Sequence, residues 1–160
     1  MHKSSSQVAI LQGQIKSGLD VLQRIQDHLD SFMADELQKM GRTTVSAVII
    51  SDGLCRFYTA IETVFVRIAK FFENSLEGER WHADLLDRMA FSIPDIRPRV
   101  ISDKTHADLR ELMKFRHFSR YYVELEHDWE RLDFLLRKYE AVKEKLRTDI
   151  EAFLKLVGSL

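Results

Sequence analysis

Apolar residues recur along the chain at steps of three and four, the spacing that places them on one face of an α-helix. The first series begins at Gln7 and runs to Gly41, a residue type that often ends helices. Its seam contains one small residue and consists of Leu11, Ile15, Gly18, Leu22, Ile25, Leu29 and Phe32. The seam is too short for an independent coiled coil, so we predict a helix of a bundle. Residues 1–6 are expected to be a flexible N-terminus, and residues 7–158 a single domain.

The second series starts with residue types that are common in strands. Thr43 to Ile50 is rich in β-branched side chains. The three- and four-residue steps nevertheless continue without a break through Ala47, Ile50, Leu54, Phe57, Ile61, Val64, Ile68 and Phe71. We therefore predict one helix from Thr44 to Glu73, with Gly53 as the place for a bend, and a strand at Val45–Ile50 as the alternative. This helix is apolar on many sides, which is typical of a central helix or one at a subunit interface.

The remaining elements are shorter or more polar. A short third helix is marked by Trp81, Leu85 and Met89. Both prolines fall in the segment 92–102, which we predict to be an irregular crossing. Thr105 and Asp108 have the spacing of a capping box and predict the start of the fourth helix. The last helix is expected from about Asp128 to near Gly158, with apolar positions at Leu132, Leu135, Tyr139, Val142, Leu146, Ile150, Phe153 and Val157. The predicted fold is all-α, an up-and-down bundle of about five helices.

Composition limits the function classes. The chain has 160 residues, of which 45% are hydrophobic and 31% charged, as expected for one globular domain. The formal net charge of -1 gives no overall basic field, so an RNA contact would need a local patch. The single cysteine, Cys55, excludes an internal disulfide, and residues 1–6 lack the apolar stretch of a secretory signal. No uninterrupted apolar run approaches the length of a membrane span, so we expect a cytoplasmic protein without a membrane partner.

Two arginines continue an apolar helix stripe. Leu109 and Leu112 lead, at helical spacing, to Arg116, Arg120 and then His127. A cation on a core-facing stripe needs an acceptor, because an unpaired buried charge costs several kcal/mol on the order given for buried ions. That acceptor is either a carboxylate of the same chain, which would make the pair structural, or a phosphate from outside, which the planar guanidinium binds through two oxygens.

Histidines supply the candidate acid and base groups, His117 and His127, because imidazole titrates near working pH. His82 and Asp84 are two residues apart and point in different directions, so they do not form a metal pair. No Cys-x-x-Cys pair, phosphate-binding glycine loop or Ser-His-Asp pattern is present. We therefore predict neither a cofactor nor a metal.

Four segments, in this order, resemble the HepT-like branch of the HEPN superfamily. They are Trp81-His82-Ala83-Asp84-Leu85-Leu86-Asp87-Arg88-Met89, Ile96-Arg97-Pro98, Arg116-His117-Phe118-Ser119-Arg120 and Asp128-Trp129. The third segment resembles the start of the HEPN motif, in which an Arg and a polar residue precede a His four to six residues after the Arg. In this chain Tyr121 stands where that branch usually has the His. A phenol titrates near ~10 and is a poor base at neutral pH.

The resemblance implies the toxin of a HEPN/nucleotidyltransferase toxin–antitoxin pair, acting as a metal-independent endoribonuclease. It implies a site of Arg116, His117, Arg120 and Tyr121. His127, seven residues after Arg120 on the same stripe, is the candidate substitute for the motif His by its spacing. The partners expected from the resemblance are a second copy of the chain, a nucleotidyltransferase antitoxin and RNA. DNA is not an expected partner.

Two further classes stay open. One is a non-catalytic HEPN-type dimer that binds RNA or a protein, and the other is a structural helical adaptor without a phosphate site. The dimer is also expected from an aromatic surplus on the second helix, formed by Phe57, Tyr58, Phe65, Phe71 and Phe72.

Overall fold

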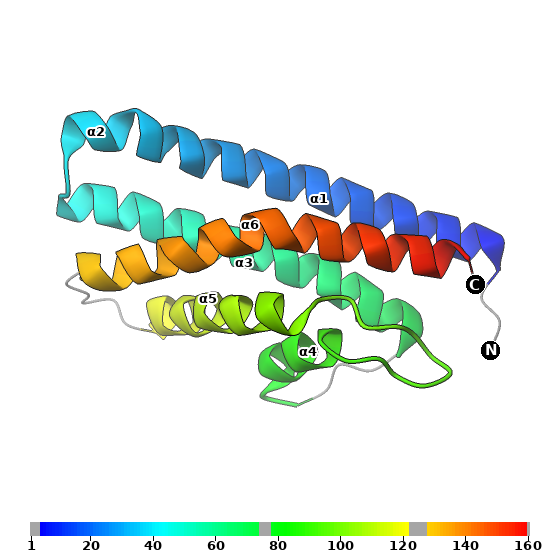
Figure 1. The fold of residues 1–160 in the computed structure, drawn as a ribbon. Coiled ribbons are helices and arrows are strands. Elements are labelled where there is room, and N and C mark those ends of the chain that lie inside the picture. The colour runs from blue at the N-terminus through cyan, green and yellow to red at the C-terminus, as the bar shows by residue number, and fades with distance from the viewer. Residues whose placement is uncertain (1–3, 74–77, 122–127, 160) are drawn as a thin grey trace.

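The protein is a bundle of antiparallel helices (Figure 1). The computed structural model describes residues 4–73, 78–121 and 128–159. Its elements are α1 (Ser5–Ala34), α2 (Glu36–Met40), α3 (Thr44–Phe72), α4 (Trp81–Met89), α5 (Asp103–Tyr121) and α6 (Trp129–Gly158). The long helices α1, α3, α5 and α6 alternate in direction, and the start of α1 lies at the same end of the bundle as the end of α6. The described residues form no strand, so the predicted all-α, up-and-down architecture of five main helices is confirmed.

The first helix differs from its prediction at both ends. It begins at Ser5, two residues early, because Ser4 and Gln7 form a capping box in which each side chain accepts the other's backbone N–H. It ends at Ala34 rather than Gly41, since the backbone of Asp35 (φ -111°, ψ -72°) interrupts the helix. The last turn is the separate α2, and Gly41 ends that segment with a positive φ of 76°.

The prediction of one helix from Thr44 is confirmed, and the strand alternative is wrong. Thr43 caps α3 by accepting the N–H of Ser46, and the helix continues through Gly53. Close packing explains the glycines: a Cβ at Gly53 would lie 2.9 Å from Leu29 Cδ1, and one at Gly18 would lie 2.6 Å from Val64 Cγ2. Both glycines therefore let α1 approach α3.

α3 is the central helix and packs against α1, α4, α5 and α6. By length and composition alone it could cross a membrane, with a mean hydropathy of 1.2, but the bundle accounts for its apolar character because its buried residues form the core. The aromatic surplus is also absorbed within the chain, since Phe57, Tyr58 and Phe65 are fully buried. Phe71 and Phe72 are partly buried against the same core, so these aromatic residues give no separate support for a dimer, and the dimer stays a prediction. The exposed apolar residues of α3 are instead Val45, Val48 and Ile49.

The crossing between α4 and α5 is fixed by a buried arginine. Arg97 donates to Glu73 Oε1 at 2.8 Å and to the carbonyl oxygens of Arg88, Phe91 and Pro98. This places the irregular segment against the end of α3. The segment is irregular as predicted, apart from an isolated bridge between Ile93 and Arg97.

The start of α5 differs from its prediction. The helix begins at Asp103, and the hydroxyl of Ser102 accepts the N–H of Thr105. Thr105 is buried and donates to Asp149 of α6 at 2.7 Å, whereas Asp108 pairs with Lys104 and Lys138. The predicted capping box at Thr105 and Asp108 is therefore wrong, because both side chains bind other partners.

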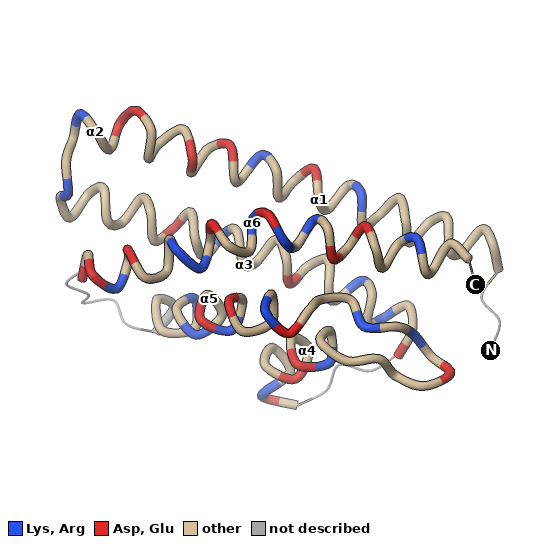
Figure 2. Tube along the Cα trace, viewed as in Figure 1, with Lys and Arg blue, Asp and Glu red and all other residues tan. Residues whose placement is uncertain are grey.

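The last helix agrees with its prediction. The side chain of Asp128 accepts the N–H of Glu130 and caps α6. Each of the eight predicted apolar positions of this helix is buried. Charged residues of both signs are spread over α6 and α5, whereas the first turns of α3 carry none (Figure 2).

Candidate functional site

Arg116 lies on the core-facing side of α5, as its register with Leu109 and Leu112 predicted. Its guanidinium binds Glu62 of α3 through two parallel bonds, Nη1 to Oε1 at 3.0 Å and Nη2 to Oε2 at 2.9 Å. Nη1 also donates to Thr59 Oγ1 at 3.2 Å, and the guanidinium carbon lies 4.8 Å from the centre of the Tyr58 ring. Fork-to-fork pairing of this kind is the strong form of an arginine–carboxylate contact.

The acceptor of Arg116 is thus a carboxylate of its own chain. The side chains of Arg116 and Glu62 are 15% and 8% exposed, so the pair is largely withdrawn from water. Of the two alternatives, a carboxylate of the same chain or an external phosphate, the structure shows the carboxylate. The guanidinium donates both Nη groups to the fold, and its charge is compensated without a phosphate.

A histidine completes this cluster. His82, at the start of α4, has Nδ1 2.7 Å from Glu62 Oε2 and 3.2 Å from Arg116 Nη2. An ionised carboxylate only accepts, so Nδ1 must carry the proton and donate to Glu62. His82 Nδ1 and Arg116 Nη2 are then both donors, and they lie close together because both donate to Glu62 Oε2. Glu62 accordingly accepts three N–H groups, and the imidazole keeps its Nε2 for another partner.

The other predicted site residues lie around this cluster or outside the described part of the chain. His117 follows Arg116 on α5 and is exposed. The backbone of Arg120 and Tyr121 forms the end of α5, but their side chains are outside the described set, as is the whole of His127. The hypothesis that Arg116, His117 and Arg120 project together into a cleft therefore stays a prediction, as do the roles of Tyr121 and His127.

Burial changes the acidity of two neighbours of Arg116. The pKa of Tyr58 is raised above its usual value, first by burial and then by the negative charge of Glu62, while Arg116 opposes the shift. The pKa of the Cys55 thiol is also raised, mainly by burial, against a hydrogen bond with Ser119. Both groups stay protonated at neutral pH, so neither is a ready base or nucleophile.

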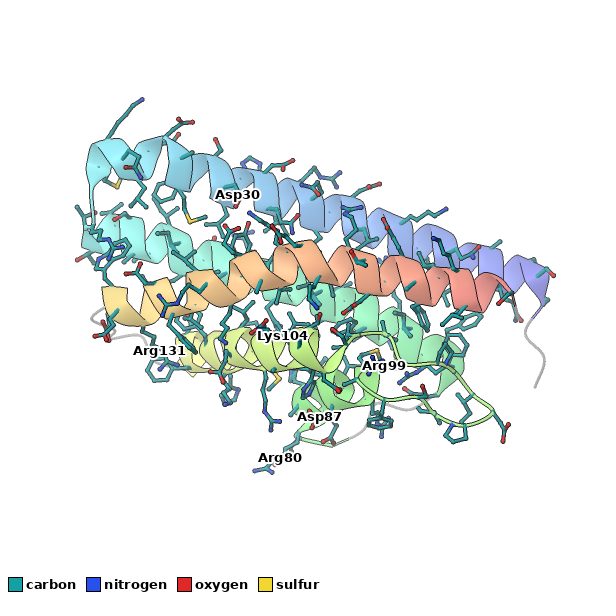
Figure 3. The ribbon with its side chains drawn as sticks, viewed as in Figure 1. Asp30, Arg80, Asp87, Arg99, Lys104 and Arg131 are labelled. Atoms are coloured by element: carbon teal, nitrogen blue, oxygen red, sulfur yellow. The ribbon has the colours of Figure 1, made fainter. Side chains whose placement is uncertain are left out.

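A second histidine–carboxylate pair lies between α4 and α5. His106 Nε2 is 2.7 Å from Asp87 Oδ1, and Arg110 is 3.9 Å from the same oxygen. Asp87 is labelled in Figure 3 beside α4. This imidazole is 20% exposed, compared with 32% for His82. Across the described residues, no group of three His, Cys, Asp or Glu side chains has a metal-binding arrangement.

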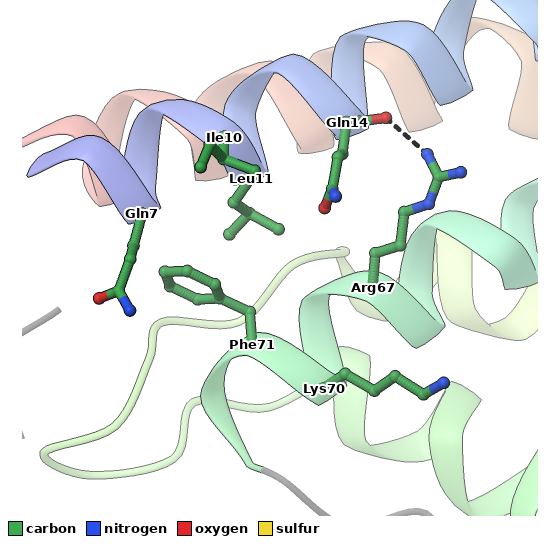
Figure 4. Close-up of a pocket in the computed structure, with 7 residues that line it drawn as sticks. All are labelled: Gln7, Ile10, Leu11, Gln14, Arg67, Lys70 and Phe71. Carbon is green, nitrogen blue, oxygen red and sulfur yellow. Dashed lines mark hydrogen bonds between the residues drawn. The ribbon is translucent and has the colours of Figure 1, made fainter. Parts of the chain in front are cut away.

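A groove of about 450 Å³ lies away from the arginine cluster, between the start of α1 and the end of α3 (Figure 4). Its floor is apolar, with Leu11 and Phe71, and Arg67 and Lys70 lie at its edge. Arg67 donates to the carbonyl oxygen of Gln14 at 2.9 Å. The groove contains none of the predicted site residues.

Sequence reasoning missed Glu62 and assigned no role to His82. A signal for Glu62 was present: Tyr58, Glu62 and Phe65 are four and three residues apart, so the carboxylate occupies an apolar stripe. His82 gave no comparable signal, because its partners are 20 and 34 residues away in the sequence.

The structure is thus an all-α bundle with an Arg–Glu–His cluster formed by side chains of α3, α4 and α5. The family model described as HepT-like protein matches residues 49–157, which include α4, α5 and most of α3 and α6. The chain belongs to this HepT-like family. No curated protein and no solved structure matches it significantly.

Proposed function

We propose that this HepT-like protein is the toxin component of a HEPN/nucleotidyltransferase toxin–antitoxin pair, and that it binds and cleaves RNA without a metal in the cytoplasm. The observation that carries the proposal is the half-buried cluster of Arg116, Glu62 and His82, which joins the motif arginine to an imidazole. Imidazole is the side chain best suited to proton transfer near neutral pH.

The proposal gives the motif residues separate roles. Arg116 holds Glu62 and positions the cluster, because its Nη groups are already engaged. His117 is exposed next to it, and we assign it and Arg120 to RNA contacts. Tyr121 and His127 complete the proposed site at the end of the motif.

The direct test is to incubate the purified protein with a mixed-sequence RNA in excess EDTA. We expect binding and cleavage, with binding weakened in His117→Ala. The matched control is His28→Ala, an exposed histidine on α1. Arg116→Ala is a poor probe of binding by itself, because it leaves the carboxylate of Glu62 buried without its cation. Absence of both binding and cleavage in the wild type would refute the proposal.

The second candidate is a non-catalytic dimer that binds RNA or a protein. Tyr121 favours it, since a phenol replaces the motif His. Binding without cleavage by the wild type, and cleavage gained in Tyr121→His, would identify the chain as an inactive relative of the ribonucleases. Association with a nucleotidyltransferase, measured by co-purification of the two proteins, tests the proposed antitoxin in either case.

We also propose that a second copy of the chain covers the exposed apolar start of α3. Val45, Val48 and Ile49 are exposed there within a segment that has no charge, which is the composition of an interface core. Light scattering at tens of micromolar (a range in which standard-size interfaces stay formed) should give a dimer. Val48→Asp should give a monomer, while Leu156→Asp, which changes an exposed apolar residue of α6, should not. A monomeric wild type would contradict this interface.

A further inference from the structure

We propose that His82 is the general base of RNA cleavage, with Glu62 and Arg116 as its positioning residues. This inference rests on the proposed ribonuclease function and assigns its proton transfer to a histidine outside the motif segment. It is carried by the way in which three helices converge on one carboxylate.

The hydrogen bonds to Glu62 determine which nitrogen of the His82 imidazole carries the proton. Glu62 Oε1 accepts from Arg116 Nη1, and Oε2 accepts from both Arg116 Nη2 and His82 Nδ1. Because Nδ1 bears the proton, the neutral ring presents a lone pair at Nε2. A carboxylate that holds Nδ1–H in this way selects the tautomer that a general base requires and stabilises the imidazolium formed after proton transfer.

The surroundings fix the ring and leave it accessible. The indole of Trp81 stacks on it, with ring centres 3.7 Å apart and planes 29° from parallel. Glu62 is held in turn by the bidentate contact with Arg116, which limits the freedom of the acceptor. About a third of the His82 side chain is exposed. A general base needs an imidazole that is held in place by a buried carboxylate and is still accessible to a bound substrate. His82 and Glu62 have this combination.

His106, the histidine of the second histidine–carboxylate pair, lacks that arrangement. His106 uses Nε2 for its bond to Asp87 and is less exposed than His82. Its carboxylate, Asp87, is about half exposed, in contrast to the buried Glu62. The His106–Asp87 pair is therefore a matched control: it joins a histidine to a carboxylate, but that carboxylate is not buried.

The proposed step is a transphosphorylation within one RNA strand. Nε2 of His82 takes the proton of a 2′-hydroxyl, and the freed oxygen forms a bond to the adjacent phosphorus. The bond from phosphorus to the 5′-oxygen of the next nucleotide breaks, and that oxygen takes a proton from water. The products are a 2′,3′-cyclic phosphate and a 5′-hydroxyl, and the imidazolium returns its proton to solvent.

The experiment compares His82→Ala with wild type and with His106→Ala, measuring RNA binding and cleavage in EDTA. We expect His82→Ala to bind RNA but to cleave it at least about 100-fold more slowly, the range for losing a general base. His106→Ala should cleave like the wild type. Added imidazole should restore part of the cleavage by His82→Ala, which a purely structural role would not allow, and His82→Asn serves as a second variant if the alanine protein does not fold.

The outcomes separate the two proposals. A wild type that cleaves RNA together with a fully active His82→Ala overturns the role of His82 and leaves the ribonuclease function intact. Equal losses in His82→Ala and His106→Ala, without rescue by imidazole, also overturn that role. A wild type that binds RNA without cleaving it, or does neither, removes the reaction and with it the base. A single 2′-deoxy substitution at the cleaved position must abolish cleavage, or the written step is wrong.

Discussion

The buried arginine of the α4–α5 crossing offers the sharpest test of how this fold is held. Arg97→Met keeps the length of the side chain but removes its charge. The Arg97 side chain is fully buried, and that of its partner Glu73 is 7% exposed. The substitution leaves this carboxylate without its cation and removes the guanidinium as a donor to three carbonyl oxygens.

The expected loss follows from these contacts. Breaking a buried ion pair by removing one partner costs about 3–5 kcal/mol, against a total stability on the order of 5–15 kcal/mol. For a domain of this size each kcal/mol lowers Tm by about 2–4 °C, so Tm should fall by roughly 6–20 °C. Burial lowers the pKa of Arg97, and the negative charge of Glu73 opposes that shift.

The assay is urea unfolding followed by circular dichroism. Arg99→Met is the matched control, because Arg99 lies in the same crossing, is 53% exposed and is 3.9 Å from Asp103 (Figure 3). It should cost no more than about 0.5 kcal/mol. The double variant Arg97→Met/Glu73→Leu should recover part of the loss, because it leaves no unpaired carboxylate. Similar midpoints for Arg97→Met and Arg99→Met would refute the anchoring role.

Two further predictions concern helix packing and alkaline pH. Gly18→Ala should lower the free energy of unfolding by about 1–3 kcal/mol, because the added Cβ would lie 2.6 Å from Val64 Cγ2. In the same unfolding assay Gly13→Ala, with nothing within 4 Å, should raise it by about 0.5–1 kcal/mol, and equal effects would contradict the packing argument. Burial raises the pKa of Tyr58 and Tyr139, so above about pH 10 the unfolded chain binds fewer protons than the folded one, and stability should fall by up to about 1.4 kcal/mol per pH unit for each. Unfolding curves measured from pH 9 to 11 should show a smaller decrease of stability with pH in Tyr139→Phe than in the wild type. An equal decrease in both proteins would contradict the role of Tyr139.

Periodicity predicted the long helices because their burial is one-sided and regular. Each apolar position expected in α6 is buried, and the stepping through Gly53 outweighed the β-branched start of α3. Tertiary packing, which favours a helix that buries its face, overrode the local strand preference. The aromatic residues of α3 suggested a dimer because a single partner helix could not cover all five of them. In the structure four elements pack against α3.

Local capping signals were less reliable, because a side chain with several possible partners satisfies the best of them. Thr105 has the sequence of a cap, but its hydroxyl donates to Asp149, a residue 44 positions away. Ser102 caps α5 instead. The break at Asp35 carries neither a proline nor a glycine, so nothing in the sequence distinguished it from the helix around it. Contacts between distant elements decide these ends, and a single sequence does not contain them.

The site lies between these two cases. Arg116 on the stripe of α5 required an acceptor, and this much followed from the sequence. Glu62 on the Tyr58–Phe65 stripe of α3 poses the converse requirement for a cation. An arginine on the apolar stripe of one helix and a glutamate on the apolar stripe of another satisfy both requirements most simply by facing each other, since an internal partner is always present and a phosphate is not. That argument reaches the Arg116–Glu62 pair without a structure, but it gives no third member. The position of His82 depends on how α4 leaves α3 and returns beside it, which is geometry that only the folded chain provides.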